Sequence, residues 1–284
     1  MGTKFMAGIA PLLVALFFFH TCLVYSQVNE VPDSIRSSLD LDTFYQKHVD
    51  VGGLPVVGSD RVSDAAMLEA AWIIEKMVGH RPELLRAMAK NRTRMAVMAF
   101  DEYTTDIPEH RHLSPRVYWD RRARGLGATP RAPAVSCAEE NLLGYPGDPY
   151  ATENICIHEF AHAIHEMGMV TLDATFDDRL KAAYQRAKSN GLWSNTYAIS
   201  NHKEYWAEAV QSWFDNNRDK DSLHNHVNTR QELIEYDPPL AELCRQVFGD
   251  GKWKYQKPLK RSPHDRSHLA KVDFEKLPHF KWRQ

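Results

Sequence analysis

Two histidines and a glutamate within five residues carry the clearest chemical signal in the sequence. The stretch is His158-Glu159-Phe160-Ala161-His162, an H-E-x-x-H pattern inside a segment with helical apolar spacing. Helical residues four positions apart share one face, so both imidazoles can reach one Zn²⁺ while Glu159 points to a water beside it. Because the chain has 14 histidines, the pattern needs further support, and a metal-free surface helix is the alternative.

A catalytic zinc also needs a third protein ligand and an open position for water. The metzincin form of the motif requires glycine at position 165 and histidine at 168, but His165 and Gly168 stand there instead. Gly168 is typical of a helix C-cap. Downstream, Glu204 and Glu208 lie four residues apart in a segment rich in aromatic residues. If that helix is buried, its two carboxylates need a functional explanation, and Glu204 is therefore the candidate third ligand. The alternative is that both carboxylates lie on a solvated helix face.

These motifs resemble those of the gluzincin metallopeptidases, and within them the catalytic domain of anthrax lethal factor and its relatives. H-E-F-A-H at 158–162 is similar to that group's H-E-F-G-H, with Ala161 in place of glycine. E-Y-W-A-E-A at 204–209 is similar to its E-F-F-A-E-A. Tyr197 stands seven residues before Glu204, as the group's active-site tyrosine does. The resemblance covers about residues 154–214 and does not extend to the toxin's delivery domains.

The resemblance implies that His158, His162 and Glu204 bind one zinc ion and that Glu159 is the general base. Zinc chemistry supports this set independently, because two histidines and one carboxylate leave a position for a water whose pKa the metal lowers. Glu159 would accept the proton of that water and pass it to the leaving amine. The expected reaction is peptide hydrolysis.

Other polar side chains would support the reaction. Tyr197 would donate a hydrogen bond to the oxyanion of the tetrahedral intermediate; an ordinary core or surface tyrosine is the alternative. Glu208 would orient a ligating histidine through its second ring nitrogen. Segment 224–230 is rich in hydrogen-bond donors and could line the cleft. The remaining histidines of this region are typical of solvated or hydrogen-bonded side chains: His165, His202, His224 and His226.

The helices and strands expected around these residues indicate an α+β fold. Ser63 is a candidate N-cap for a helix that ends at the break Arg81-Pro82, and a shorter helix is expected over 83–90. Residues 95–100 form an apolar run typical of a buried strand, and 134–137 are expected to form a short edge strand.

The second half is expected to be mostly helical. Frequent prolines and glycines between Thr105 and Tyr150, including Gly125-Leu126-Gly127, predict irregular loops. The motif helix is expected to begin at Asp148, whose carboxylate can cap it ahead of proline 149. The resemblance implies a zincin-like domain over 27–250, with a small mixed sheet in its N-terminal half and the active site between the halves.

Composition excludes several classes of protein. Hydrophobic residues make up 43% and charged residues 25% of the chain, with a net charge of −2, which excludes wholesale disorder, a multi-span membrane protein and a chain-wide nucleic-acid surface. Residues 251–284 differ, with ten basic and three acidic residues and three prolines. They predict a basic, extended or loosely packed tail, either solvated or bound to acidic extracellular polymers.

The first 26 residues have the pattern of a secretory signal peptide. Lys4 precedes an apolar run, and Val24 and Ser26 suit the −3 and −1 positions of a cleavage site. A retained anchor is the alternative, which Pro11 and His20 weaken. No later run is long and apolar enough to span a bilayer. The expected location is therefore extracellular.

Secretion changes the expectations for cysteine and asparagine. Cys22 leaves with the signal peptide, and we expect Cys137 and Cys156 to form a disulfide that leaves Cys244 free. Three buried thiols are the alternative. Asn91 begins an N-x-T sequon and is a candidate glycosylation site.

Together these features predict a secreted zinc metallopeptidase that acts on protein or peptide substrates. One alternative is a secreted zinc-containing matrix or binding protein without catalytic activity, although a purely structural site would need neither Glu159 nor Tyr197. Another is a secreted hydrolase that cleaves a different bond, because the chemistry of a zinc-activated water is generic.

Overall fold

A single six-stranded sheet organises the first half of the chain. The computed structural model describes residues 27–283, so the predicted signal peptide lies outside the described residues. The strand order is β1-β2-β3-β4-β6-β5. β3, β4 and β6 run parallel, whereas β1, β2 and β5 pair antiparallel with their neighbours. The strands are β1 (Asn29–Glu30), β2 (Lys47–Val51), β3 (Leu54–Gly58), β4 (Arg94–Met98), β5 (Gly125–Leu126) and β6 (Ala134–Ala138).

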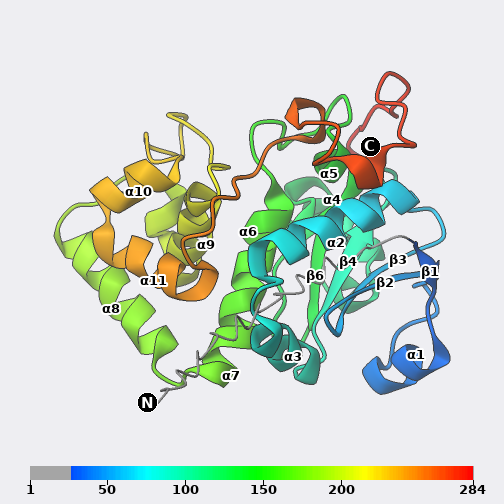
Figure 1. Cartoon of the computed structure of the whole chain (residues 1–284), viewed down its shortest axis with the longest axis horizontal. Coiled ribbons are helices and arrows are strands. Elements are labelled where there is room, and N and C mark those ends of the chain that lie inside the picture. Colours follow the sequence, from blue (N-terminus) through cyan, green and yellow to red (C-terminus); the bar gives the residue numbers. More distant parts are fainter. Residues whose placement is uncertain (1–26, 284) are drawn as a thin grey trace, which may run out of the picture.

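Helices account for most of the remaining regular structure. Figure 1 shows α8 to α11 grouped on one side of the molecule, the sheet on the other, and α6 between them. The mixed α+β prediction is therefore confirmed. The helices are α1 (Asp33–Leu39), α2 (Asp64–Val78), α3 (Pro82–Lys90), α4 (Arg116–Arg122), α5 (Glu139–Leu143), α6 (Ile155–Ala163), α7 (Val170–Leu172), α8 (Phe176–Ser189), α9 (His202–Trp213), α10 (Arg230–Tyr236) and α11 (Pro238–Phe248).

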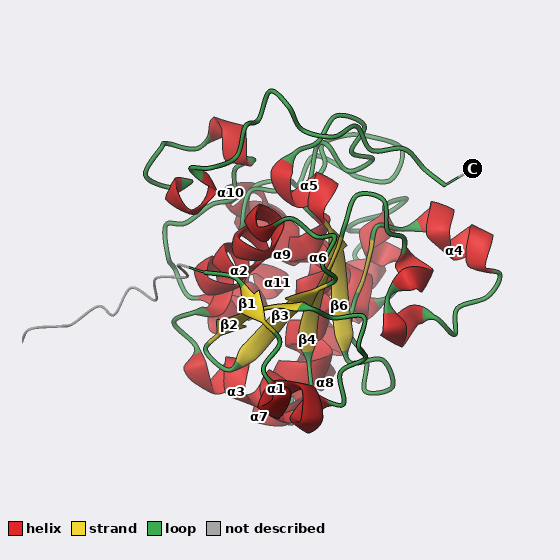
Figure 2. Cartoon of the chain, turned by 90° about the vertical axis from the view of Figure 1, so that its right-hand side faces the viewer, coloured by secondary structure: helices red, strands yellow, loops and turns green. Residues whose placement is uncertain are grey.

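The central strands are apolar on both faces because both faces are covered. One face, which includes Val56 and Val97, shares the main core with α2, α3 and α6. The opposite face, which includes Val57 and Met98, packs against α1 and the loop after it. Figure 2 shows α1 and α6 on opposite sides of the sheet, and α4 beside the end of the sheet that carries β6. Continuous apolar strands are the expected pattern for a sheet buried on two sides.

Local sequence signals place the helices that cover the sheet. Ser63 caps α2, because its Oγ accepts a hydrogen bond from the Ala66 N–H at 3.2 Å, as predicted. α3 begins at Pro82, one residue before the expected start. The β2–β3 hairpin turns at Gly52 and Gly53, with φ of 58° and 93°, a conformation that glycine adopts without steric cost.

The expected start of the motif helix at Asp148 is wrong. α6 begins at Ile155 and is capped by the side chain of Asn154. Asp148 accepts hydrogen bonds from the Tyr150 N–H at 2.9 Å and from the Asn141 side chain at 2.9 Å. The carboxylate is thus used in a local turn and a tertiary contact, so it is not free to cap a helix.

The expected C-cap at Gly168 is also wrong. α6 continues through a π-helical segment, Ile164–Met169, into α7. A Cβ on Gly168 would lie 2.4 Å from Cδ1 of Leu84 on α3. The lack of a side chain at Gly168 thus lets the π-helical segment pack closely against α3, and it does not mark a helix end.

The prediction of an edge strand over 134–137 is wrong in its position. β6 lies between β4 and β5 and is fully buried. The segment Gly125-Leu126, expected to be part of a loop, forms the outer strand β5. A two-residue strand is defined by its neighbour, which local sequence patterns do not reveal.

The predicted disulfide is contradicted as well. Cys137, Cys156 and Cys244 are all free and buried. The Sγ of Cys137 contacts Sδ of Met95 at 3.7 Å in the core, and buried thiols of this kind act as small apolar side chains. At the candidate glycosylation site, the Asn91 amide donates to the carbonyl oxygen of Met167, at 2.7 Å.

The C-terminal segment, residues 251–283, has only short 3-10 turns but is not loosely packed. Arg261 pairs with Glu69 of α2 at 2.6 Å, and both side chains are at most 2% exposed. Its guanidinium lies 4.0 Å from the ring centre of Trp72, and His268 also contacts Glu69, at 2.8 Å. In Figure 1 this orange-to-red segment crosses above α2. Within residues 27–283, no helix has the length and apolar character of a membrane span.

Candidate metal centre and cleft

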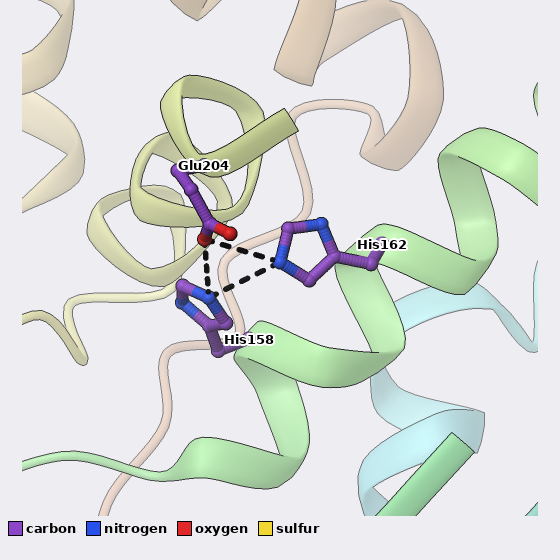
Figure 3. Close-up of side chains that lie close together, drawn as sticks. All are labelled: His158, His162 and Glu204. Carbon is purple, nitrogen blue, oxygen red and sulfur yellow. Dashed lines mark hydrogen bonds and ion pairs between the residues drawn. The ribbon is translucent and has the colours of Figure 1, made fainter. Parts of the chain in front are cut away.

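Three side chains from two helices converge on one point. His158 and His162 lie one turn apart on α6, and Glu204 lies in the first turn of α9 (Figure 3). The Nε2 atoms of the histidines are 3.2 Å apart, and Oε2 of Glu204 lies 3.1 Å from the first and 3.3 Å from the second. Among residues 27–283, this is the group of three side chains that could hold a metal ion.

The donor set fits zinc. Two imidazole nitrogens and one carboxylate oxygen are the ligands of many catalytic zinc sites, and three protein ligands leave a fourth position open. The atoms already lie within 4.8 Å of one another. All three members of this group are residues that the sequence predicted as ligands.

Capping and a cross-helix hydrogen bond hold Glu204 in place. Asn201 caps α9 by accepting hydrogen bonds from the N–H groups of Lys203 at 2.9 Å and Glu204 at 3.1 Å. The buried indole of Trp206, one half-turn further on, donates to the carbonyl oxygen of Ala161 on α6 at 2.8 Å. These contacts fix the first turn of α9 relative to the histidine-bearing helix.

The nearest orienting partner of His158 is a residue that the sequence analysis missed. Nδ1 of His158 lies 2.8 Å from Oε1 of Gln211 and 3.5 Å from Oε1 of Glu208. Gln211 donates in turn to Oε2 of Glu153 at 2.8 Å. Gln211 follows Glu208 by three residues on α9, and this i,i+3 spacing is the signal that could have identified it.

Glu208 mainly joins α9 to the loop beyond it. Its Oε2 accepts a hydrogen bond from Asn217 at 2.9 Å and lies 3.5 Å from Nε2 of His224. Segment 224–230 was expected to line the cleft, and of its residues His224 does so. His226 instead packs edge-on against Tyr236.

The carboxylates around the two histidines create a site that attracts cations. Burial alone would lower the pKa of His158, but its hydrogen bond to Glu204 and the charges of Glu159 and Glu208 raise that pKa to about 10. Burial alone would raise the pKa of Glu204, but the hydrogen bonds from His158 and His162 hold it well below its usual range. A divalent cation can replace the proton that these groups share.

Glu159 lies beside this group and is 9% exposed. Burial raises the pKa of its carboxyl, and the charges on His158 and His162 only partly offset this rise. A carboxylate of raised pKa holds a proton more readily than an exposed glutamate.

The ring centre of Tyr197 lies 6.3 Å from the ring centre of His158. The backbone N–H of Tyr197 donates to the carbonyl oxygen of Leu223 at 2.7 Å, and Tyr197 lines the same cavity as Glu204. Burial and the nearby carboxylates raise the pKa of the phenol. The hydroxyl therefore stays protonated and able to donate.

A cavity of about 800 Å³ opens over the three converging side chains. Residues 119–129 form one wall and residues 197–224 form another, so the cleft lies between the two halves of the chain. β5 and the residue after it come close to α6 here: a Cβ on Gly127 would lie 2.7 Å from Cβ of His162, and one on Gly125 would lie 3.0 Å from Cγ of Glu159. Only glycine allows this approach.

Comparison with known proteins does not identify a family. No protein-family model and no curated relative matches the chain. A similar solved structure is the Pro-Pro endopeptidase PPEP-2 from Paenibacillus alvei, with 18% identity and a TM-score of 0.40 over 70% of this chain and 98% of that chain. A likeness at this level does not decide the fold or the function, so the function has to be inferred from the site.

Proposed function

We propose that this protein is a secreted zinc metallopeptidase of zincin-like fold, related to the gluzincins and to the lethal factor group. The observation that carries the proposal is the convergence of His158, His162 and Glu204 at the floor of a cleft, with Glu159 beside them. One zinc ion held there would lower the pKa of a water and polarise the carbonyl of the scissile peptide bond.

Glu159 would handle the protons of the reaction. Its buried carboxylate lies next to both histidines, and its pKa is raised by burial. It would take a proton from the attacking water and deliver it to the leaving amine, which are the two transfers that peptide hydrolysis needs.

Tyr197 would stabilise the negative charge that develops on the carbonyl oxygen. Its phenol keeps its proton and faces the same space as Glu204. A hydrogen bond that strengthens as the charge forms lowers the barrier of the reaction. The hydrogen bond from its backbone to Leu223 holds the ring in position.

The sheet edge beside the site supports a peptide as the substrate. β5 is the last strand of the sheet, and residues 126–129 line the cleft. An edge strand offers backbone groups that can pair with an extended chain. A peptide paired with β5 would pass over His162, since Gly127 adjoins that residue.

Secretion is part of this proposal because residues 1–26 have the charge, the apolar run and the small residues of a cleaved signal peptide. Expression of the full chain in a secreting cell line, followed by N-terminal sequencing of the medium fraction, should give Gln27 as the first residue. Retention of the uncleaved chain in the membrane fraction would contradict secretion.

The enzymatic part is tested by incubating the mature chain, residues 27–284, with a diverse peptide library and identifying the products by mass spectrometry. We expect cleavage that stops when a chelator removes the metal and returns when zinc is added. If a chain with one equivalent of bound zinc cleaves no peptide, the protein is a zinc-binding protein and not a peptidase.

A further inference from the structure

Three lysine and arginine side chains line the cleft, and they differ in their partners. Lys203 pairs with Glu166, and Arg218 pairs with Asp221 at 2.9 Å. Arg122 forms no ion pair with any residue in the range 27–283. It is thus the cleft-lining guanidinium that no carboxylate of the described chain contacts as an ion pair.

The residues around Arg122 leave N–H donors of its guanidinium available for a ligand. It is the last residue of α4, and its guanidinium lies 5.6 Å from the ring centre of Trp119. Burial alone would lower the pKa of this guanidinium, but the nearby phenols of Tyr197 and Tyr118 raise it. A guanidinium has five N–H donors in a planar fork that matches a carboxylate, so two phenols do not use its full capacity.

α4 is held firmly enough to present this side chain in one place. The buried carboxylate of Asp120, two residues before Arg122, accepts hydrogen bonds from the Thr105 N–H at 2.9 Å and the Thr105 hydroxyl at 2.8 Å. Arg283 from the C-terminal segment binds the same carboxylate at 2.7 Å. An anchored helix loses little conformational freedom when its terminal arginine binds a ligand.

Arg122 also lies close to the reacting groups. Arg122 lines the same cavity as Tyr197, which we assign to the oxyanion. Burial raises the pKa of Glu159, and the positive charge of Arg122 partly offsets this rise. A group of the substrate that binds Arg122 must therefore lie near the scissile bond.

We propose that Arg122 binds a carboxylate of the peptide substrate beside the scissile bond, so that the enzyme prefers acidic peptides. This inference rests on the proposed peptidase function and adds a substrate class to it. The carboxylate can belong to an aspartate or glutamate side chain or to the free C-terminus of the peptide. Both sources present the same planar anion to the guanidinium.

The test compares kcat/KM for peptides that differ only in one charge. A peptide cleaved in the library is remade with glutamate or its neutral isostere glutamine at each of the three positions on either side of the scissile bond. Each version is made with a free and an amidated C-terminus, which separates the two sources of the carboxylate. The readout is the acid-to-neutral ratio of kcat/KM, because a change in the surroundings of Tyr197 would affect both peptides alike.

The wild type should prefer the acidic peptide at one position, or the free C-terminus, by about tenfold or more. Arg122→Gln should bring this ratio close to one. Arg122→Lys should give an intermediate ratio, since lysine keeps the positive charge but lacks the planar pair of N–H donors that matches a carboxylate. Arg121→Gln is the matched control, because Arg121 is on the same helix but does not line the cleft, and it should keep the wild-type ratio.

Zinc content and thermal melting of every variant will show that each one is folded. If the wild type cleaves peptides with no acidic preference at any position, the carboxylate proposal is wrong while the peptidase function stands. A preference that survives in Arg122→Gln also overturns the proposal. If no peptide is cleaved at all, the proposed function fails and the substrate class fails with it.

Discussion

The amide oxygen of Gln211 lies 2.8 Å from Nδ1 of His158, closer than the carboxylate of Glu208 at 3.5 Å. The amide nitrogen of Gln211 donates to Glu153, so its oxygen is the atom that faces the imidazole. Nδ1 of His158 must then carry the proton of the neutral ring, which leaves the Nε2 lone pair free for a metal. A glutamine and not a carboxylate sets the tautomer of this histidine.

Gln211→Met should weaken zinc binding more than Glu208→Gln does. The methionine keeps the shape but removes the acceptor, and loss of such a partner typically costs about 10- to 100-fold in metal affinity. Competition with a chromophoric chelator measures both affinities. An equal or larger loss of zinc affinity in Glu208→Gln would show that Glu208, and not Gln211, orients His158.

Gly127→Ala should lower stability or zinc affinity. The added methyl would lie 2.7 Å from Cβ of His162, so β5 or α6 must move, and overpacking of this kind costs about 1–3 kcal/mol. Gly251→Ala is the control, because its Cβ would meet no atom within 4 Å. Denaturant unfolding and zinc titration of both variants check this. If wild type and Gly127→Ala have the same free energy of unfolding and the same zinc affinity, a methyl group fits at position 127 and the close approach to His162 does not require glycine.

Arg261→Met should destabilise the fold by about 3–5 kcal/mol, since it leaves the charge of Glu69 buried with a weaker partner. The change tests whether the C-terminal segment is part of the folded domain. Lys260→Met, at the preceding exposed position, should change the free energy of unfolding by less than about 0.5 kcal/mol. A similar small effect for both would mean that the segment does not contribute to stability.

Zinc binding should release about one proton near neutral pH. The metal-free pKa of His158 is raised to about 10 by Glu204, Glu159 and Glu208 against the effect of burial, so its imidazole is protonated at pH 7 and must lose that proton to bind a metal. Zinc affinity should therefore fall by about tenfold for each unit that the pH is lowered. Calorimetry in buffers of different ionisation enthalpy measures the released protons. Affinity that is constant between about pH 6 and 8 would contradict this coupling.

The sequence was sufficient for the parts of the site that obey helical spacing. His158 and His162 share a face because they are four residues apart, and Glu204 was a candidate because it and Glu208 lie four residues apart in a segment rich in aromatic residues. Gln211 was missed because glutamine is neither a metal ligand nor a titratable group, so its role depends on a contact between two helices.

The errors in the fold come from residues whose roles are set by distant partners. Asp148 has the local signature of a helix cap, but Lys257 of the C-terminal segment binds its carboxylate at 3.3 Å. Gly168 has the signature of a helix end, but the packing of α3 explains it. β5 consists of two residues, and only its pairing with β6 makes it a strand.

The measurement that tests the central claim most directly is the turnover of Glu159→Gln compared with wild type at equal zinc content. The amide has nearly the same shape as the carboxylate but cannot accept a proton from water. We predict one zinc per chain and an unchanged melting temperature in both proteins, with kcat/KM in the variant lowered by about 100-fold or more. Cleavage by Glu159→Gln at the wild-type rate would contradict the proposal that this site performs the hydrolysis.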